Sequence, residues 1–140
     1  MKGDRIRYRR GYKYWLANDY RVQTGIRPDY PVETEFLSLT TDGWLTIRHG
    51  YAWDGCSGPT KDDRTNMRAG LVHDAGYQLI RDGWIDQKFK NAFDRELQKI
   101  MIEDGAPEIR ANYYFEGVHL GGASSAKPGS DGGKPLCEAP

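Results

Sequence analysis

The spacing of hydrophobic positions changes near residue 60, and this change divides the chain into two halves. Residues 5–48 alternate apolar and polar side chains in short bursts, which is typical of half-buried strands. Residues 25–31, with one glycine and two prolines, predict a loop, and the segment Thr41-Asp42-Gly43 predicts a tight hairpin turn. The first half therefore predicts a small antiparallel meander, with strands at residues 12–16, 20–23, 36–39 and 45–48.

The second half has the helical period. Apolar residues at positions 67, 71, 72, 75, 79 and 80 predict a helix that Thr65 or Asn66 caps and that ends before Gly83. A second helix begins near Asp86 and stops at residues 105–107, and a short third helix spans about 108–120. We therefore expect an α+β fold in one domain, residues 1–121, with a β meander followed by an antiparallel helical hairpin and a third helix. The Gly-, Ser- and Pro-rich residues 122–140 predict a flexible tail.

Composition narrows the range of partners. A chain of 140 residues supports one modest core, and its 20 basic and 20 acidic residues balance, so no sequence-specific nucleic-acid partner is expected. The first 13 residues, however, carry six Lys or Arg side chains against Asp4 alone. Because these charges alternate with Ile6 and Tyr8, they favour an edge strand protected from aggregation. Binding of phosphate or lipid headgroups is the alternative for this basic arm.

Cysteine usage and hydropathy indicate where the chain is made. The two cysteines, Cys56 and Cys137, are 81 residues apart, and Cys137 falls in the predicted tail. A disulfide framework is therefore not expected, and reduced thiols fit synthesis in the cytoplasm. The chain has no N-terminal apolar run of signal-peptide length and no apolar stretch of about 18 residues, so neither a signal peptide nor a transmembrane segment is expected.

Residues 71–77, Leu-Val-His-Asp-Ala-Gly-Tyr, are the main candidate for chemistry. On a helical wheel His73 and Tyr77 share the border of the apolar face, whereas Asp74 points away toward a neighbouring loop. Asp94 lies just outside the apolar face of the second helix, so an antiparallel hairpin can bring it to His73. A carboxylate that accepts a hydrogen bond from one imidazole nitrogen leaves the other nitrogen as a base. Taken singly, each of these residues has a structural explanation, His73 as a satisfied core residue and Asp94 as surface.

A glycine-rich segment at residues 53–59, Trp-Asp-Gly-Cys-Ser-Gly-Pro, predicts a loop that turns several carbonyls toward one point. Hard cations such as Ca²⁺ bind backbone carbonyls together with a carboxylate. Asp74 is the first candidate carboxylate, and Asp54 is a second one beside Gly55 and Gly58.

Other roles for this region carry less support. Cys56 as a nucleophile is a weaker alternative, because nothing marks its thiol as activated, and Trp53 is expected in the core or an interface. Gly70 and Gly76 weaken a helix, which indicates either close helix packing or room for a ligand beside His73.

Two resemblances follow from these segments. Residues 50–59, residues 71–77 and Phe93-Asp94, together with a closing segment at 114–121, resemble a family of phage and prophage proteins known as domain-of-unknown-function family thirteen-fifty-three. The match spans about residues 10–122. It implies a phage origin, with synthesis in the host cytoplasm and release on lysis or association with the virion, and it implies no established activity.

The same residues are similar to the phospholipase A2 superfamily, which has an aromatic-x-Gly-x-Gly calcium loop, then His-Asp-x-x-Tyr on a helix, then an Asp on the antiparallel helix. The resemblance implies that His73 is the base and Asp74 the calcium ligand, that Tyr77 and Asp94 orient His73, and that Gly55 and Gly58 belong to the calcium loop. The substrate would be a phospholipid or another ester. The chain departs from the pattern in an extra loop residue, in the absent cysteine framework and in its N-terminal meander.

Two alternatives remain beside this hypothesis. In the first, the chain is a virion, host-envelope or accessory protein without enzymatic activity. His73 and Asp74 then hold the loop at residues 53–59 onto the helical hairpin. In the second, weaker alternative the His-Asp pair belongs to a phosphohydrolase, which needs an upstream histidine, and His49 is the one available.

Overall fold

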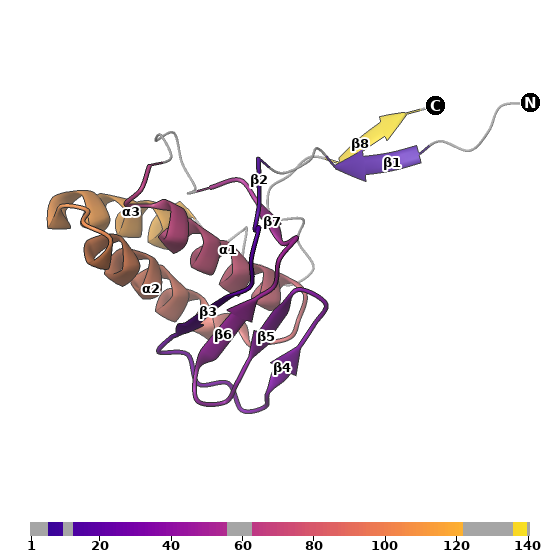
Figure 1. Cartoon of the computed structure of the whole chain (residues 1–140), viewed down its shortest axis with the longest axis horizontal. Helices are drawn as coiled ribbons and strands as arrows, with labels where there is room; N and C mark the ends of the chain where they lie inside the picture. Colours follow the sequence, from indigo (N-terminus) through magenta and orange to yellow (C-terminus); the bar gives the residue numbers. More distant parts are fainter. Residues whose placement is uncertain (1–5, 10–12, 56–62, 122–135, 140) are drawn as a thin grey trace, which may run out of the picture.

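The computed structural model describes residues 6–9, 13–55, 63–121 and 136–139 and confirms an α+β fold. Antiparallel strands occupy the N-terminal half, and three helices follow them, of which the first two form a hairpin (Figure 1). The strands are β1 (Ile6–Arg9), β2 (Tyr14–Trp15), β3 (Tyr20–Gln23), β4 (Val32–Glu33), β5 (Leu37–Leu39), β6 (Trp44–Ile47), β7 (Ala52–Trp53) and β8 (Leu136–Ala139). The helices are α1 (Met67–Arg81), the 3-10 turn η1 (Gln87–Phe89), α2 (Lys90–Glu103) and α3 (Glu108–Gly121).

The main sheet has the strand order β3-β6-β5-β4. Strands β4, β5 and β6 form an antiparallel meander. The predicted strands β5 and β6 and the predicted turn between them are present, with Gly43 at φ 93°. The expectation of a simple meander is wrong for β3, which pairs with β6 rather than with the strand that follows it. The loop of residues 25–31 instead carries the chain across the sheet to its far edge. Strand β4 lies at that edge, and the sequence pattern does not predict it.

A second pair of strands joins the start of the sheet region to its end. Strand β2 pairs with β7, so that Tyr14 lies opposite Trp53, and Leu16 donates a backbone hydrogen bond to Tyr51 (2.8 Å). Trp53 was predicted to begin a loop, but it ends strand β7, because β2 supplies a partner for its backbone. Of the predicted loop at residues 53–59, residues 56–59 lie outside the described residues.

The two ends of the chain contain a pair of strands. The predicted first strand is present as β1, and it pairs antiparallel with β8. Figure 1 shows this two-stranded ribbon apart from the body that the helices and the main sheet form. Strand β8 was not predicted, because residues 136–139 lie in the segment expected to be a flexible tail, and residues 122–135 lie outside the described part of the chain.

The helix boundaries follow local signals in the sequence. Gly83 lies just after the C-cap of α1 with φ 80°, as predicted, and Asp86 caps η1 by accepting a hydrogen bond from the backbone N–H of Lys88 (2.7 Å). Asn66 occupies the N-cap of α1, but its side chain does not bond the helix. Its amide donates to the Tyr114 hydroxyl of α3 (3.2 Å), which ties the start of α1 to the third helix.

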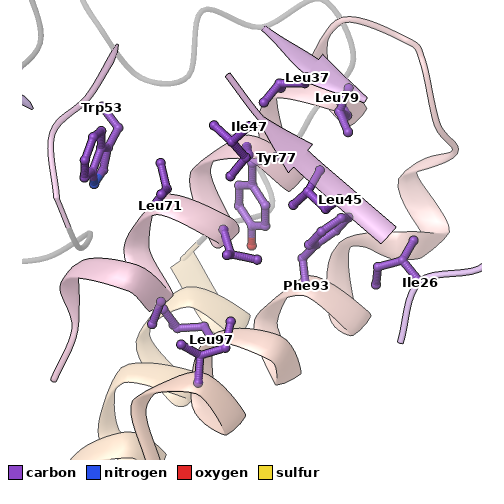
Figure 2. Close-up of a cluster of buried hydrophobic side chains, with 14 of the residues drawn as sticks. Ile26, Leu37, Leu45, Ile47, Trp53, Leu71, Tyr77, Leu79, Phe93 and Leu97 are labelled. Carbon is purple, nitrogen blue, oxygen red and sulfur yellow. The ribbon is translucent and has the colours of Figure 1, made fainter. Parts of the chain in front are cut away.

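The core lies between the main sheet and the helical hairpin (Figure 2). Leu45 and Ile47 alternate with partly exposed neighbours in β6 and point toward α1 and α2, as one face of a strand does. Helix α1 is covered on most of its circumference, with 10 of its 15 residues buried, because the sheet lies on one side and α2 on another. None of the described helices is long and apolar enough to cross a membrane.

The closest approach of α1 to α2 occurs at Gly76. A Cβ atom at this position would lie 2.3 Å from the Phe93 ring, so the glycine serves close packing, one of the two roles expected for it.

We predict that Gly76→Ala lowers the free energy of unfolding by about 1–3 kcal/mol, because the added methyl displaces a fully buried ring. Gly117→Ala is the control, since a Cβ there meets nothing within 4 Å and alanine favours a helix. Urea unfolding would contradict the packing argument if both variants were equally stable.

Candidate functional site

The centre of the site is the carboxylate of Asp94, which is 0% exposed. It accepts three hydrogen bonds: from Nε2 of His73 (2.7 Å), from the hydroxyl of Tyr77 (2.6 Å) and from Nζ of Lys90 (2.7 Å). We call these four residues the Asp94 cluster. Asp94 meets His73 across the helical hairpin, as expected from the sequence, but the surface position expected for Asp94 taken alone is wrong. The residue is fully buried, because α1 and α3 both pack against α2.

Local helix geometry explains why these donors converge. His73 and Tyr77 are four residues apart on α1, so their rings lie together on one face, with centroids 4.1 Å apart and planes tilted by 41°. Lys90 and Asp94 have the same spacing on α2, which makes them neighbours on that helix. Gly76 lets the two helices approach closely at Phe93, next to Asp94, and this approach brings the carboxylate within reach of both α1 side chains.

The hydrogen bonds decide the charge of Asp94. Burial by itself raises its pKa, but the hydrogen bonds from His73, Lys90 and Tyr77 outweigh burial and hold the pKa at about 2. The carboxylate is therefore ionised at neutral pH. The pKa of the Tyr77 hydroxyl is raised well above its usual range by burial and by its bond to Asp94, so this hydroxyl remains a donor.

An ionised Asp94 also determines the tautomer of His73. A carboxylate without a proton only accepts hydrogen bonds, so Nε2 of His73 carries the hydrogen in their 2.7 Å contact. In the neutral imidazole Nδ1 is then the nitrogen with a free lone pair. No described residue forms a hydrogen bond with Nδ1 of His73, which makes this atom the one available to accept a proton.

Sequence reasoning missed Lys90 and His119. Lys90 is buried, and besides Asp94 its Nζ donates to the carbonyl of His119 (3.2 Å) and approaches that of Val118 (3.5 Å). These carbonyls belong to the last turn of α3, where the helix dipole favours a cation. Nδ1 of His119 lies 3.8 Å from Asp94, and its ring stacks on Phe115. The spacing of Lys90 and Asp94 was a usable signal, but nothing in the sequence indicates that α3 ends beside them.

Asp74 lies on a different side of α1, as predicted. Its carboxylate accepts a hydrogen bond from the Tyr51 hydroxyl (2.8 Å), which connects the helix to the segment that enters β7. Burial raises the pKa of Asp74, and the Tyr51 bond and the nearby charges of Arg81 and His73 oppose this rise without cancelling it. Asp74 is thus a partly buried carboxylate that burial makes easier to protonate than an exposed one.

The remaining predicted metal ligands are only partly described. Asp54 is exposed and accepts a hydrogen bond from the backbone N–H of Lys13 (2.9 Å). Gly55 is buried with φ 86°, a conformation that favours glycine. Gly58 lies outside the described residues, as does Cys56. Within the described ranges no three His, Cys, Asp or Glu side chains gather into a group that could hold a metal ion.

His49, the candidate second histidine of a phosphohydrolase, lies outside the Asp94 cluster. Its side chain is exposed, and its Nδ1 contacts the carboxylate of Asp19 at 2.9 Å. Its own backbone N–H also donates to Asp19 (2.9 Å), and both bonds lower the pKa of that carboxyl. The described contacts of His49 are thus with Asp19, on the sheet side of the molecule.

The contribution of Lys90 to the charge of Asp94 can be measured. In the unfolded chain the pKa of an aspartate is about 3.9, so the folded value of about 2 makes stability rise with pH between these two values. We predict that Lys90→Met raises the folded pKa of Asp94. The rise in unfolding free energy from about pH 2 to about pH 4 then becomes smaller, from a wild-type contribution on the order of 2–3 kcal/mol.

Urea unfolding at several acidic pH values measures this slope. Lys99→Met is the matched control, because it removes the same charge from an exposed position on α2. An unchanged slope in Lys90→Met, or an equal change in Lys99→Met, would show that Lys90 does not set the pKa of Asp94.

Comparison with known proteins identifies no relative. No protein-family model matches the chain, and no curated protein or solved structure matches it significantly. The function must therefore be argued from the chemistry of the Asp94 cluster and its surroundings.

Proposed function

We propose that this protein is a calcium-dependent hydrolase of lipid esters, similar in its chemistry to phospholipase A2, with His73 as the general base. The observation that carries the proposal is the bond between Nε2 of His73 and the ionised, fully buried Asp94. It fixes the imidazole tautomer and directs proton transfer to Nδ1.

The proposed reaction uses the chain's own residues as follows. Nδ1 of His73 takes a proton from a water molecule while the water oxygen forms a bond to the ester carbonyl carbon. Asp94 stabilises the imidazolium that results. When the carbon–oxygen bond of the leaving alcohol breaks, His73 returns the proton to the alcohol oxygen. Tyr77 and Lys90 keep Asp94 ionised and oriented throughout.

The donors around Asp74 fit calcium in their chemistry. A carboxylate and backbone carbonyls are the oxygen ligands that calcium prefers. Asp74 and the carbonyls of the loop that holds Gly55 and Gly58 would bind the ion, with Asp54 as a further carboxylate. Its chemical contribution would be to polarise the ester carbonyl and stabilise the oxyanion.

The biological setting belongs to the same proposal. The resemblance to phage and prophage proteins supports synthesis in a host cytoplasm, followed by release on lysis or association with the virion. A lipid-ester hydrolase in that setting would act on the phospholipids of the host envelope.

A structural role for the same residues is the second candidate. His73 is only 4% exposed and bonds Asp94 of α2, and Asp74 bonds Tyr51, so the two residues also hold α1 against α2 and against the segment that enters β7. In a virion or accessory protein this clamp would be their whole function. The two candidates differ in what a substitution of His73 removes, which is activity in the first and stability in the second.

We predict that His73→Gln lowers calcium-dependent release of fatty acid from phospholipid vesicles by about 10²–10⁴-fold, the usual contribution of a general base. The melting temperature should fall much less than a clamp would require, because Tyr77 and Lys90 still donate to Asp94. His49→Gln is the control, since that histidine is exposed and outside the cluster. Wild-type protein that leaves vesicles intact in millimolar-range calcium would exclude the lipase function. A collapse of stability in His73→Gln would favour the clamp.

Calcium binding has a separate test. A ligand that binds only the folded protein raises its melting temperature with ligand concentration. We predict such a rise with Ca²⁺ for the wild type and its loss in Asp74→Asn. Asp82→Asn serves as a control, because Asp82 is an exposed carboxylate at the C-cap of α1, about two turns of helix away from Asp74. Equal calcium shifts in the wild type and in Asp74→Asn would remove Asp74 from the metal site.

A further inference from the structure

Trp53 carries a hydrogen-bond donor that none of the described residues uses. Among the residues that the structure describes, its indole Nε1 is the one buried side-chain nitrogen or oxygen without a hydrogen-bond partner. The residue is 7% exposed. Burial of an unpaired polar group destabilises the fold, and a buried tryptophan usually finds an acceptor for its N–H. A donor that none of the described residues pairs, at such a cost, is free to bond an acceptor on a ligand.

The direction of the Trp53 side chain follows from the strand. Side chains two residues apart point to the same face of a strand, so Trp53 and Tyr51 share a face. The Tyr51 hydroxyl bonds Asp74 on α1 (2.8 Å), which shows that this face looks toward the helix. Figure 2 agrees, since it draws the Trp53 indole beside Leu71 of α1. The unpaired N–H therefore lies on the side of α1 that carries Asp74.

We infer that the indole N–H of Trp53 donates a hydrogen bond to an oxygen atom of the bound substrate, on the side of α1 that carries Asp74. This inference rests on the proposed lipid-ester hydrolysis and adds a substrate-binding residue to it. Trp53 thereby gains a role in addition to its place in the core.

The chemistry of the donor restricts its partner. An indole N–H is neutral, donates only and does not ionise near neutral pH, so it selects an acceptor and offers nothing to an ammonium group. The Tyr14 ring covers one side of the indole, with centroids 5.5 Å apart, and the side chain of Leu71 is apolar. The subsite therefore suits one acceptor oxygen in apolar surroundings, either the ester carbonyl or a phosphoryl oxygen of a phospholipid.

Nuclear magnetic resonance of the indole N–H groups tests this inference on the intact protein. The chain has 4 tryptophans, so four indole signals are expected, and Trp53→Phe identifies the signal of Trp53 by its loss. The probes are a short-chain diacyl phosphatidylcholine, used on His73→Gln so that it is not hydrolysed, and the matching diether lipid. Both are added with calcium below the concentration at which they form micelles. The diether lacks the ester carbonyls and so distinguishes the two acceptors.

We expect the Trp53 signal to shift and its N–H to exchange more slowly with solvent when lipid binds, while the Trp84 signal stays in place. A shift with the diacyl lipid alone assigns the carbonyl as acceptor, and a shift with both lipids assigns the phosphoryl oxygen. In vesicle assays Trp53→Phe should raise KM or the lipid dissociation constant about five- to tenfold, the effect of one neutral hydrogen bond. Trp84→Phe, at a half-exposed position beyond the C-terminal end of α1, should leave both values unchanged.

Two results would overturn the inference. One is a Trp53 signal that neither lipid moves up to the micelle concentration. The other is a Trp53 N–H resonance at the position of a hydrogen-bonded indole in the protein without lipid, which would mean that the chain already supplies its acceptor. Vesicle hydrolysis by the wild type is measured in parallel. Hydrolysis with an unmoved Trp53 signal rejects the inference alone, whereas absence of hydrolysis rejects the proposed function.

Discussion

The structure depends on the burial of one charged group, the carboxylate of Asp94. An ion without solvent costs several kcal/mol unless hydrogen bonds replace its hydration. Here α1 supplies two donors, His73 and Tyr77, and α2 supplies Lys90, which also binds the last turn of α3. One carboxylate thereby sets the register of α1 against α2 and holds the end of α3 in place. The orientation of His73 is a consequence of the same requirement.

The fold and the proposed chemistry therefore share their residues. A histidine held by a buried carboxylate is a base with a defined tautomer, and it is also a bond between two helices. The surroundings distinguish the two roles better than the cluster does. Asp74 and the unpaired N–H of Trp53 both belong to the interface between α1 and the segment that enters β7. Asp74 has a partner in Tyr51, but the N–H of Trp53 has none among the described residues, and a purely structural clamp does not explain that N–H.

Much of the fold could be predicted, because long elements repeat their period several times. The three helices lie within about two to four residues of their predicted bounds, and the turn at Gly43 is where the sequence places it. Strands β4 and β7 were missed, since two residues carry no measurable period. The pairing of β3 with β6 was missed as well, because alternation identifies a strand but not its neighbour. In the site, helical spacing predicted that His73 and Asp94 could meet, and the role of Lys90 went unnoticed although its spacing was visible.

By itself, the sequence determined which residues share a face of a helix, because the geometry of the helix is local. That was enough to separate His73 and Tyr77 from Asp74. Only the tertiary structure decided what covers each face. Asp94, expected just outside the apolar face of its helix, is fully buried and ionised, because α3 packs on α2 and Lys90 bridges the two helices. The unpaired donor of Trp53 was equally invisible in the sequence, since the lack of a partner is a property of the whole arrangement and not of any residue type.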